Sequence, residues 1–373
     1  MPIKMTLKDM KKQSIYNALS KITDTWQLDG SSEDPEYSNS LFKYLVKIKQ
    51  EKPTLPICSN LEPQEIPYNV SLFHFLLYYT YSPKYPFVTY GENVLIFGDF
   101  SGKQYNTIEI SFPLISNAKS ALKYFNKLLS YPSFNSLLKE NNIKKIILRD
   151  VNDNFINILR SDNEKFIFKL QSLKELNYAT YDVNKTLKLV GDKFANLRWH
   201  LNSFEKAGHT IEVVPLDKSI KQVIHLIGQW HSNALKDRGF SYVNVRSDKL
   251  GARLFGFGNN ELQNMDEIVS PDNVLSRVLK VNGNVAAFNL GYPLGIFKKA
   301  NVFAHAIGIS DVSIPHLAEY AQYDFWKQVK KNGYYYINDG PTWKNKLETY
   351  KDKFRPIKKK RYYWATLSIN SLK

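Results

Sequence analysis

The sequence predicts an α/β (α+β) protein with two successive folds, each a mixed and largely antiparallel sheet flanked by helices. Three observations predict this. The chain has 373 residues, which is enough for about two domains. Hydrophobic residues make up 43% of it and aromatic residues 14%, so it can bury a core. Strand-like and helix-like segments alternate, in an order that starts again near residue 165. We expect an adapter region over 1–67 and domains over 68–163 and 164–373.

The first domain is expected to begin with a hairpin. Strands over 87–90 and 94–97 flank a Gly-Glu-Asn turn, and a third strand follows over 107–114. Apolar residues at helical spacing predict a helix over 117–130. A buried strand over 143–149 and a short helix over 153–160 complete this domain, and the junction to the next lies near 161–164.

The second domain restarts with a strand over 165–170 and a long helix. Six apolar residues spaced 3, 4, 3, 4 and 3 apart predict one continuous helix over 187–204: Leu187, Val190, Phe194, Leu197, Leu201 and Phe204. Gly208 is placed to end that helix. A strand over 210–215 and a helix over 219–236 follow.

The last third of the chain has a distinctive order of elements. Strands over 274–281 and 284–292 flank an Asn-Gly turn, and a third strand covers 301–309. A helix over 315–331, a strand over 333–338, a helix over 343–353 and a strand over 361–367 follow. The expected order is therefore β-β-β-α-β-α-β.

The charge of the chain favours a polyanionic partner. The formal net charge is +16, and residues 341–373 hold ten Lys or Arg against two acids. This segment could bind RNA phosphates or anionic lipid, or it could be merely solvated. The candidate polyanion-binding residues are Lys344, Lys346, Lys358, Lys359, Lys360 and Arg361.

Other compositional features exclude several classes of protein. The single cysteine, Cys58, excludes a disulfide scaffold and a thiolate zinc site. The seven histidines include no His-Glu-x-x-His spacing, so we expect no metal site. The sequence shows no apolar signal core at its start and no apolar run long enough to span a membrane. We therefore expect a cytoplasmic protein.

Two groups of residues carry a resemblance to a known family. The first is Tyr181, Asp182, Val183, Leu187, Leu189, Gly191, Lys193, Phe194, Arg198, Asn202 and Phe204, and the second is Tyr336 to Gly340, Leu347, Tyr350, Lys351, Phe354 and Pro356. The element order of the last third resembles the core of the GNAT acyltransferases. The two groups resemble the phosphatidylglycerol lysyltransferase C-terminal domain and its uncharacterised soluble relatives, which hold two GNAT folds in tandem, and are also similar to the Fem peptidyltransferases. The resemblance covers about residues 68–367.

The resemblance implies transfer of an acyl or aminoacyl group, with an aminoacyl-tRNA as donor and an amine or hydroxyl as acceptor. It implies no cofactor. An Arg-x-x-Gly-x-Gly match at Arg253 to Gly258 could suggest coenzyme A, but it precedes the hairpin instead of following the third strand of the core. Two alternatives stay open: a non-catalytic protein that binds RNA or an anionic membrane surface, and a CoA-dependent N-acyltransferase.

Candidate site residues follow from strand ends and helix faces. The sequence Asn338-Asp339-Gly340 follows a predicted strand, where ligands often bind in α/β sheets. Asp339 could be a general base, bind an α-ammonium group or simply form a turn. Lys351 could neutralise a phosphate or an oxyanion, and His305 could face a cleft or be a core histidine.

The predicted long helix supplies the remaining candidates. Arg198 and Asn202 lie four residues apart and share one helix face, and Lys193 also lies off the apolar stripe. They could hold an anionic or carbonyl group, or form a solvated face. We expect the catalytic residues to be Asp339, Asn338 and Arg198, and the substrate-binding residues to be Lys193, Asn202, Gly340, Lys351 and His305.

Overall fold

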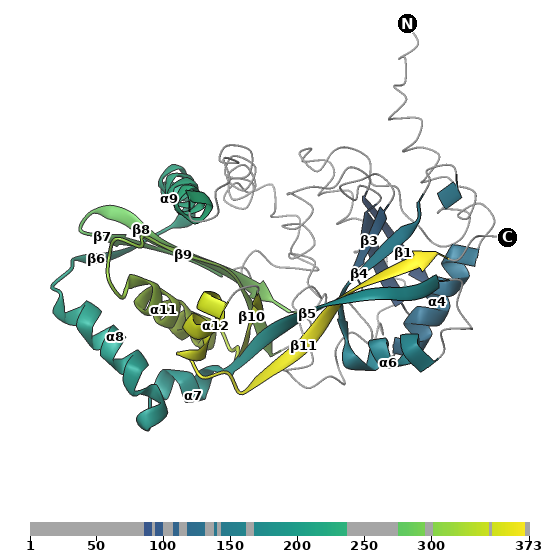
Figure 1. Cartoon of the computed structure of the whole chain (residues 1–373). Helices are drawn as coiled ribbons and strands as arrows, with labels where there is room; N and C mark the ends of the chain where they lie inside the picture. Colours follow the sequence, from purple (N-terminus) through teal and green to yellow (C-terminus); the bar gives the residue numbers. More distant parts are fainter. Residues whose placement is uncertain are drawn as a thin grey trace, which may run out of the picture. The chain divides into compact units, whose positions relative to one another are not determined.

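The computed structural model describes residues 86–91, 94–99, 107–111, 118–130, 138–139, 143–161, 168–236, 275–294, 301–342 and 345–369. The predicted adapter region and the Arg253 to Gly258 segment lie outside these residues, as does most of the junction over 161–164. The described part confirms the α/β class, with mixed strands and flanking helices (Figure 1).

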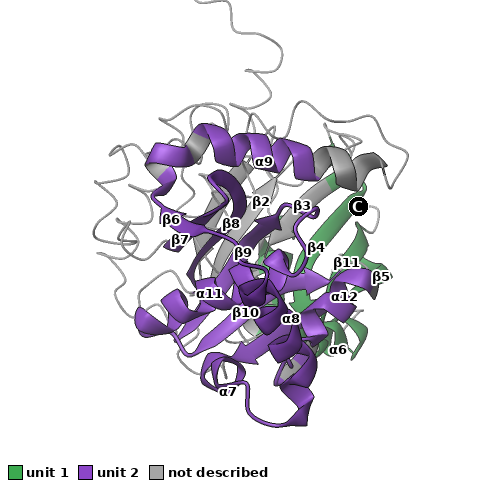
Figure 2. Cartoon of the chain, turned by 90° about the vertical axis from the view of Figure 1, so that its left-hand side faces the viewer, with its two compact units in different colours: residues 1–61, 82–176, 361–373 green, residues 62–81, 177–360 purple. Residues whose placement is uncertain are grey.

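The chain folds as two compact units, and each unit is built from separate stretches of the sequence. The first comprises residues 1–61, 82–176 and 361–373, and the second comprises 62–81 and 177–360 (Figure 2). Strands β5 (Phe168–Asp182) and β11 (Lys358–Ile369) each have residues in both units. The division at residue 163 expected from the sequence stays a prediction.

The first unit contains the predicted hairpin and the strands that continue it. β1 (Pro86–Gly91) pairs antiparallel with β2 (Val94–Asp99), and β2 pairs antiparallel with β3 (Thr107–Ser111). β4 (Lys145–Asn152) is parallel to β3 and antiparallel to β11. Helices α4 (Ala118–Ser130) and α6 (Asp153–Ser161) bury Leu122, Phe125, Leu129, Phe155, Ile156 and Leu159.

The last third of the chain has the predicted β-β-β-α-β-α-β order, and all of it except most of the final strand, β11, lies in the second unit. The strands of this unit hydrogen-bond in the order β5, β10 (Tyr336–Thr342), β9 (Val302–Ser310), β8 (Asn284–Pro293), β7 (Leu275–Val281) and β6 (Ile211–Val214). Only the β10–β9 pair is parallel among these neighbours. This sheet is therefore mixed and largely antiparallel, as predicted.

Helices cover both faces of this sheet. α9 (Leu216–Lys236) lies on one face of β7 to β9, and α11 (Leu317–Lys331) lies on the other (Figure 1). α8 (Ala195–Lys206) packs on α11, and α12 (Asn345–Asp352) lies near β10. The core between sheet and helices includes Tyr181, Phe303, Phe325, Trp326 and Phe354, all fully or almost fully buried.

The prediction of one continuous helix over 187–204 is wrong. The chain forms α7 (Val183–Lys188), a short 3-10 helix (Asp192–Phe194) and then α8. Leu189 and Gly191 adopt positive φ angles of 53° and 88°, which a continuous helix cannot contain. Val190, expected on the buried stripe, is 71% exposed. Only the part of the stripe within α8 and the residue before it, Phe194, is buried.

Two strands also extend beyond their predicted bounds. β5 continues to Asp182, where the sequence predicts a strand over 165–170 only. β10 extends to Thr342 and therefore includes the Asn338-Asp339-Gly340 sequence, which the prediction places after the strand. The Asp-Gly pair therefore does not form a connecting turn.

Candidate functional site

The candidate site lies where two parallel strands stop pairing. The register of β10 with β9 pairs Asn338 with Ala304, and no parallel pair is recorded beyond it in the described residues. The next residue on β9 is His305 and the next on β10 is Asp339. Their side chains meet, with His305 Nδ1 3.2 Å from Asp339 Oδ1. The point of divergence between the strands therefore brings a histidine and a carboxylate together.

A bulge in β10 sets the direction of Asp339. The pairing of β10 with β5 shifts register between Asn338 and Pro341, and Gly340 has a φ of 65°. Glycine adopts this left-handed conformation without the strain that other residues have. The Gly340 amide donates to Asn338 Oδ1 at 3.0 Å, which stabilises the bulge. Asn338 and Gly340 thus shape the backbone around Asp339, as bulges near active sites often do.

Lys351 from α12 is the second partner of Asp339. Its Nζ lies 3.7 Å from Asp339 Oδ2 and donates to the backbone oxygens of Asp339 and Gly340, the latter at 3.2 Å. The Lys351 side chain is 6% exposed and the Asp339 side chain 11%. This is a buried ion pair, and the ammonium also satisfies carbonyl groups that the bulge leaves without strand partners.

The charges of this pair favour an ionised carboxylate. Burial by itself raises the pKa of Asp339, but the Lys351 charge and the His305 contact together outweigh it and hold the pKa below its ordinary value. Burial lowers the pKa of Lys351, and attraction to Asp339 partly offsets that effect. At neutral pH Asp339 is therefore a carboxylate with little solvent around it.

The orientation of His305 follows from its other neighbour. Asn289 donates its amide to the Ala321 carbonyl oxygen at 3.3 Å, so its Oδ1 is the atom that faces His305 Nε2 at 2.9 Å. His305 Nε2 therefore carries a proton and donates it. Its Nδ1 faces the Asp339 carboxylate, so a proton placed on Nδ1 would be donated to Oδ1, which lies 3.2 Å away. The pair His305–Asp339 can thus hold one proton between its facing atoms.

Small residues make room for His305. A Cβ on Gly308 would lie 3.1 Å from the His305 ring, and a Cβ on Gly291 would lie 2.2 Å from the Ala304 carbonyl oxygen. Gly291 is the strand partner of His305 in β8, at a register shift. The sequence indicates this close approach only indirectly, because a glycine inside a strand often marks a place where another backbone comes near.

Two tyrosines enclose the site. The Tyr181 hydroxyl donates to the Lys351 carbonyl oxygen at 3.0 Å. The Tyr350 hydroxyl lies 3.1 Å from the Ala318 carbonyl oxygen and 3.0 Å from Gln322 Oε1. Burial, and after it nearby carboxylates, raises the pKa of Tyr181 and Tyr350 well above the ordinary value. Both hydroxyls therefore stay protonated at neutral pH and hold the C-terminal end of α12.

Sequence reasoning missed Asn289. It is 2% exposed and lies in an otherwise apolar strand between Phe288 and Leu290. A buried amide needs hydrogen-bond partners, so a lone Asn in such a strand is a signal that could have placed it near another polar group.

Within the described residues, no contact joins Asp339 to the candidates on α8 (Arg198 and Asn202) or to Lys193 on the preceding 3-10 helix. Arg198 donates to the carbonyl oxygens of Leu189 and Gly191, the latter at 2.8 Å, and so fixes the turn before α8. Lys193 is exposed, with its Nζ 5.4 Å from the centre of the Phe194 ring. Asn202 is exposed, and no partner is recorded for its side chain within the described residues. The assignment of Arg198, Lys193 and Asn202 to the site stays a prediction.

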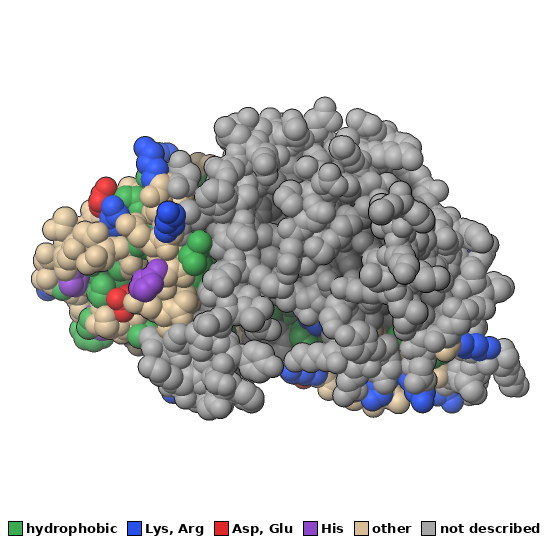
Figure 3. Space-filling model, turned by 90° about the horizontal axis from the view of Figure 1, so that it is seen from above, with side chains coloured by type: hydrophobic (Ala, Val, Ile, Leu, Met, Phe, Trp, Pro, Cys, Tyr) green, Lys and Arg blue, Asp and Glu red, His purple; other side chains and the backbone are tan. Residues whose placement is uncertain are grey.

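The basic segment is partly neutralised. Lys359 Nζ lies 2.8 Å from carboxylate oxygens of both Glu348 and Asp352. Lys346 and Arg361 are exposed, Lys344 lies outside the described residues, and Lys358 and Lys360 are placed only as strand positions of β11. On the face seen in Figure 3, the described Lys and Arg side chains are scattered among other atoms and form no continuous basic surface.

Among the helices of the described ranges, none combines the length and the apolar character needed to cross a membrane.

Comparison with known proteins places this site in a family. The model of the phosphatidylglycerol lysyltransferase C-terminal domain matches residues 150–365, which include Asp339, His305, Asn289 and Lys351. No curated protein sequence matches the chain.

Two solved structures share the fold. A conserved protein of unknown function from Bacteroides thetaiotaomicron is 17% identical, with a TM-score of 0.54 over 76% of this chain and 86% of that one. L-PGS from Bacillus licheniformis is 14% identical, with a TM-score of 0.51 over 92% of this chain and 93% of that one. A tandem GNAT protein from the clavulanic acid biosynthesis pathway matches at 8% identity over 91% and 96% of the two chains, with a TM-score of 0.47.

The expected fold and family are thus confirmed. The family match covers more than half of the chain, and the chain therefore belongs to the family of the phosphatidylglycerol lysyltransferase C-terminal domain.

Proposed function

We propose that this chain is an acyltransferase that moves an amino acid from an aminoacyl-tRNA to an amine or hydroxyl acceptor. Its family is lysyltransferase-like and has a GNAT-type fold, which supports a transferase. The observation that carries the proposal is the ionised Asp339, enclosed between His305 and Lys351 where β9 and β10 diverge. Such a carboxylate is suited to bind a cationic amine or to accept a proton.

The reaction requires orientation and proton transfer more than bond activation. An aminoacyl ester is already activated, so the enzyme must hold it, remove a proton from the attacking group and stabilise the oxyanion. This scheme needs no covalent nucleophile, which agrees with a single cysteine, Cys58.

The electrostatics of Asp339 favour one of its two proposed roles. A general base works best when its pKa is near the working pH, and the pKa of Asp339 is held below its ordinary value. Binding the α-ammonium of an aminoacyl group needs only a lasting negative charge. We therefore assign Asp339 first to ammonium binding, with the facing Nδ1 of His305 as the group that can take up a proton beside it.

The contacts of Lys351 favour a different role from the phosphate or oxyanion contact expected from the sequence. Its ammonium already contacts the Asp339 carboxylate and two backbone oxygens. Lys351 is therefore better suited to hold the bulge and Asp339 in place than to bind a phosphate group.

The test is the Asp339→Asn variant, which keeps the shape of the side chain and removes its charge. We expect transfer from charged tRNA to fall by roughly 10- to 10²-fold, because a hydrogen bond to a charged group contributes about 1.5–3 kcal/mol. Asp192→Asn is the matched control, because Asp192 is exposed on the 3-10 helix before α8. That variant should transfer at the parental rate. A mixture of charged tRNAs should be tried as the donor in one assay, and acetyl-CoA should be tried in a separate assay.

Each outcome distinguishes the hypotheses. Parental transfer by Asp339→Asn would remove Asp339 from the active site. Transfer from acetyl-CoA alone would support the CoA-dependent alternative. If neither donor supports transfer by the parent protein while RNA binding persists, the chain is a binding protein on a transferase fold.

A further inference from the structure

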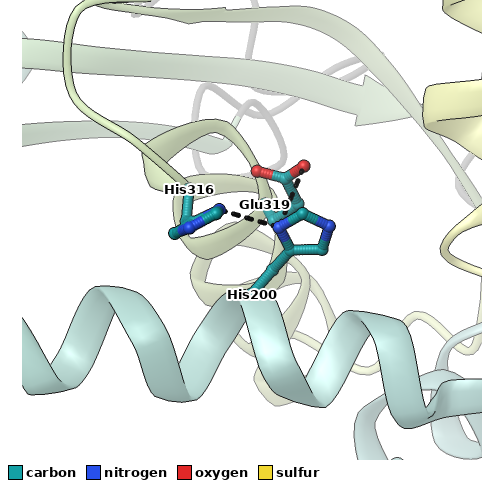
Figure 4. A group of neighbouring side chains, drawn as sticks. All are labelled: His200, His316 and Glu319. Carbon is teal, nitrogen blue, oxygen red and sulfur yellow. Dashed lines mark hydrogen bonds and ion pairs between the residues drawn. The ribbon is translucent and has the colours of Figure 1, made fainter.

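A second cluster of ionisable side chains lies at the start of α11, facing α8. His316 immediately precedes α11, Glu319 is in its first turn, and His200 projects from α8 (Figure 4). His316 and Glu319 are three residues apart and lie on one side of the helix start. None of the three contacts Asp339, His305 or Lys351 directly among the recorded interactions of the described residues.

The donor atoms of this cluster converge. The two Nδ1 atoms of His200 and His316 are 2.8 Å apart, and His200 Nδ1 is 3.9 Å from Glu319 Oε1. One ligand atom from each residue lies within 4.8 Å of the others. Zinc bonds of about 2.0–2.1 Å in a tetrahedral site hold ligand atoms roughly 3.3 Å apart. The cluster therefore needs only small side-chain movements to surround one ion.

The number of protons that the two facing imidazole nitrogens can hold favours a bound cation in this cluster. Two imidazole Nδ1 atoms at 2.8 Å can share one proton between them, but two protons would place like charges in contact. At least one lone pair is therefore directed into the cluster. Glu319 adds a carboxylate that is only 6% exposed, and a buried charge needs a partner.

Lys353 supplies that partner in the absence of a metal ion. Its Nζ lies 2.6 Å from Glu319 Oε1 and is partly exposed, with 23% of its side chain accessible. A long, flexible lysine can move away at small cost, because its ammonium can return to water. Lys353 therefore balances Glu319 and competes with any cation for it.

Trp199 covers the two imidazole rings. Its ring centre is 4.9 Å from that of His200 and 4.9 Å from that of His316, both in edge-on arrangements. Trp199 itself is 58% exposed, so the cluster lies close to the surface. An ion from solution could reach it without a rearrangement of the fold, and the indole would report its arrival.

We propose that His200, His316 and Glu319 form a binding site for a divalent transition metal ion such as Zn²⁺. Two imidazoles and one carboxylate suit Zn²⁺, and also Co²⁺, Ni²⁺ and Cu²⁺, whereas Mg²⁺ and Ca²⁺ prefer oxygen ligands. The bound ion fastens α8 to the start of α11. This proposal departs from the sequence-based expectation of no metal site, and it does not depend on the proposed transferase activity.

Metal titration of the chelator-treated, full-length protein tests the proposal. With Zn²⁺ alone in a calorimeter, we expect a site of one equivalent that His200→Gln and His316→Gln each weaken by at least 10-fold. Lys353→Met should tighten binding several-fold, because it removes a competing charge. His225→Gln is the matched control, since His225 is exposed on α9 and contacts Gln229. It should bind as the parent does.

Two spectroscopic measurements keep the result independent of folding defects. Co²⁺ should give visible absorption bands of a tetrahedral or five-coordinate site in the parent and not in the histidine variants. Cu²⁺ should quench a component of the tryptophan fluorescence that Trp199→Phe removes, while Trp199→Phe still binds Zn²⁺. Absence of stoichiometric binding by the parent, or equal binding by the parent and both histidine variants, would overturn the proposal.

Discussion

Replacing Lys351 by methionine tests the buried pair that organises the candidate site. Methionine keeps much of the apolar stem and removes the ammonium. The change leaves Asp339 charged at 11% exposure and takes a donor from two backbone oxygens. Breaking a buried ion pair by removing one partner costs about 3–5 kcal/mol. Because His305 still contacts Asp339, we expect the lower end, about 3 kcal/mol.

A double-mutant cycle isolates the charge. In the Lys351→Met/Asp339→Asn variant no unpaired carboxylate remains, so we expect it to regain about 1.5–3 kcal/mol relative to Lys351→Met alone. The assay is urea unfolding followed by tryptophan fluorescence, with thermal melting as a second probe. A loss of 3 kcal/mol corresponds to a fall in melting temperature of roughly 6–12 °C for a domain of this size.

The outcome that contradicts this reasoning is additivity. If the two single substitutions add and Lys351→Met costs under about 1 kcal/mol, solvent already screens the pair and the site is open. The proposed ammonium-binding role of Asp339 would then lose its electrostatic basis.

Three further predictions follow from the same geometry. The pKa of Asp339 is lowered in the folded protein, so its contribution to stability is present above the ordinary carboxyl pKa and is lost as pH falls through the folded value. In Lys351→Met, burial should instead raise the pKa of Asp339, so the folded variant takes up a proton in acid. Urea unfolding at pH 7 and at about pH 5 should therefore show that Lys351→Met gains stability relative to the parent at the lower pH. Gly291→Ala should cost about 1–3 kcal/mol in urea unfolding, because its Cβ would lie 2.2 Å from a backbone oxygen of β9; a cost near zero would mean that this part of the sheet adjusts freely. In tRNA binding, Lys359→Gln should leave the slope of log Kd against log salt nearly unchanged, since two carboxylates already pair with Lys359, whereas Arg361→Gln should reduce the slope by roughly 0.7–0.9; equal slopes for both variants would exclude Arg361 from an RNA surface.

The sequence predicts the order of helices and strands well, because apolar residues recur at the spacing of the face that each element buries. The β-β-β-α-β-α-β order of the last third of the chain follows from alternation in strands and from three-four spacing in helices. The same spacing failed over 187–204, because Leu189 and Gly191 take positive φ angles that break the helix and expose Val190, and the spacing of apolar residues does not reveal such a break. Arg198, which fixes this turn, has no local pattern that would distinguish it from a surface arginine.

The site was predictable only in part. Asp339 was found through its place after a strand and within a family motif, although its actual setting is a bulge inside β10. His305 and Lys351 were named singly, but their convergence on Asp339 depends on strand register and on the packing of α12. Neither quantity can be derived from one sequence. The cluster of His200, His316 and Glu319 joins residues more than a hundred positions apart, and spacing rules do not detect such groups.

The discontinuous first unit has a consequence for folding during synthesis. β4 pairs with β11, and the side chains of Tyr363 and Trp364 donate to Asp153 and Asp150, which lie 210 and 214 residues earlier. When β4 leaves the ribosome, the strand that covers one of its edges has not been made. The first unit can complete its sheet only after residues 177–360 have been translated. An unpaired strand edge invites aggregation. Expression of a fragment that ends before residue 361 should therefore give insoluble protein, and slowing translation should not rescue it.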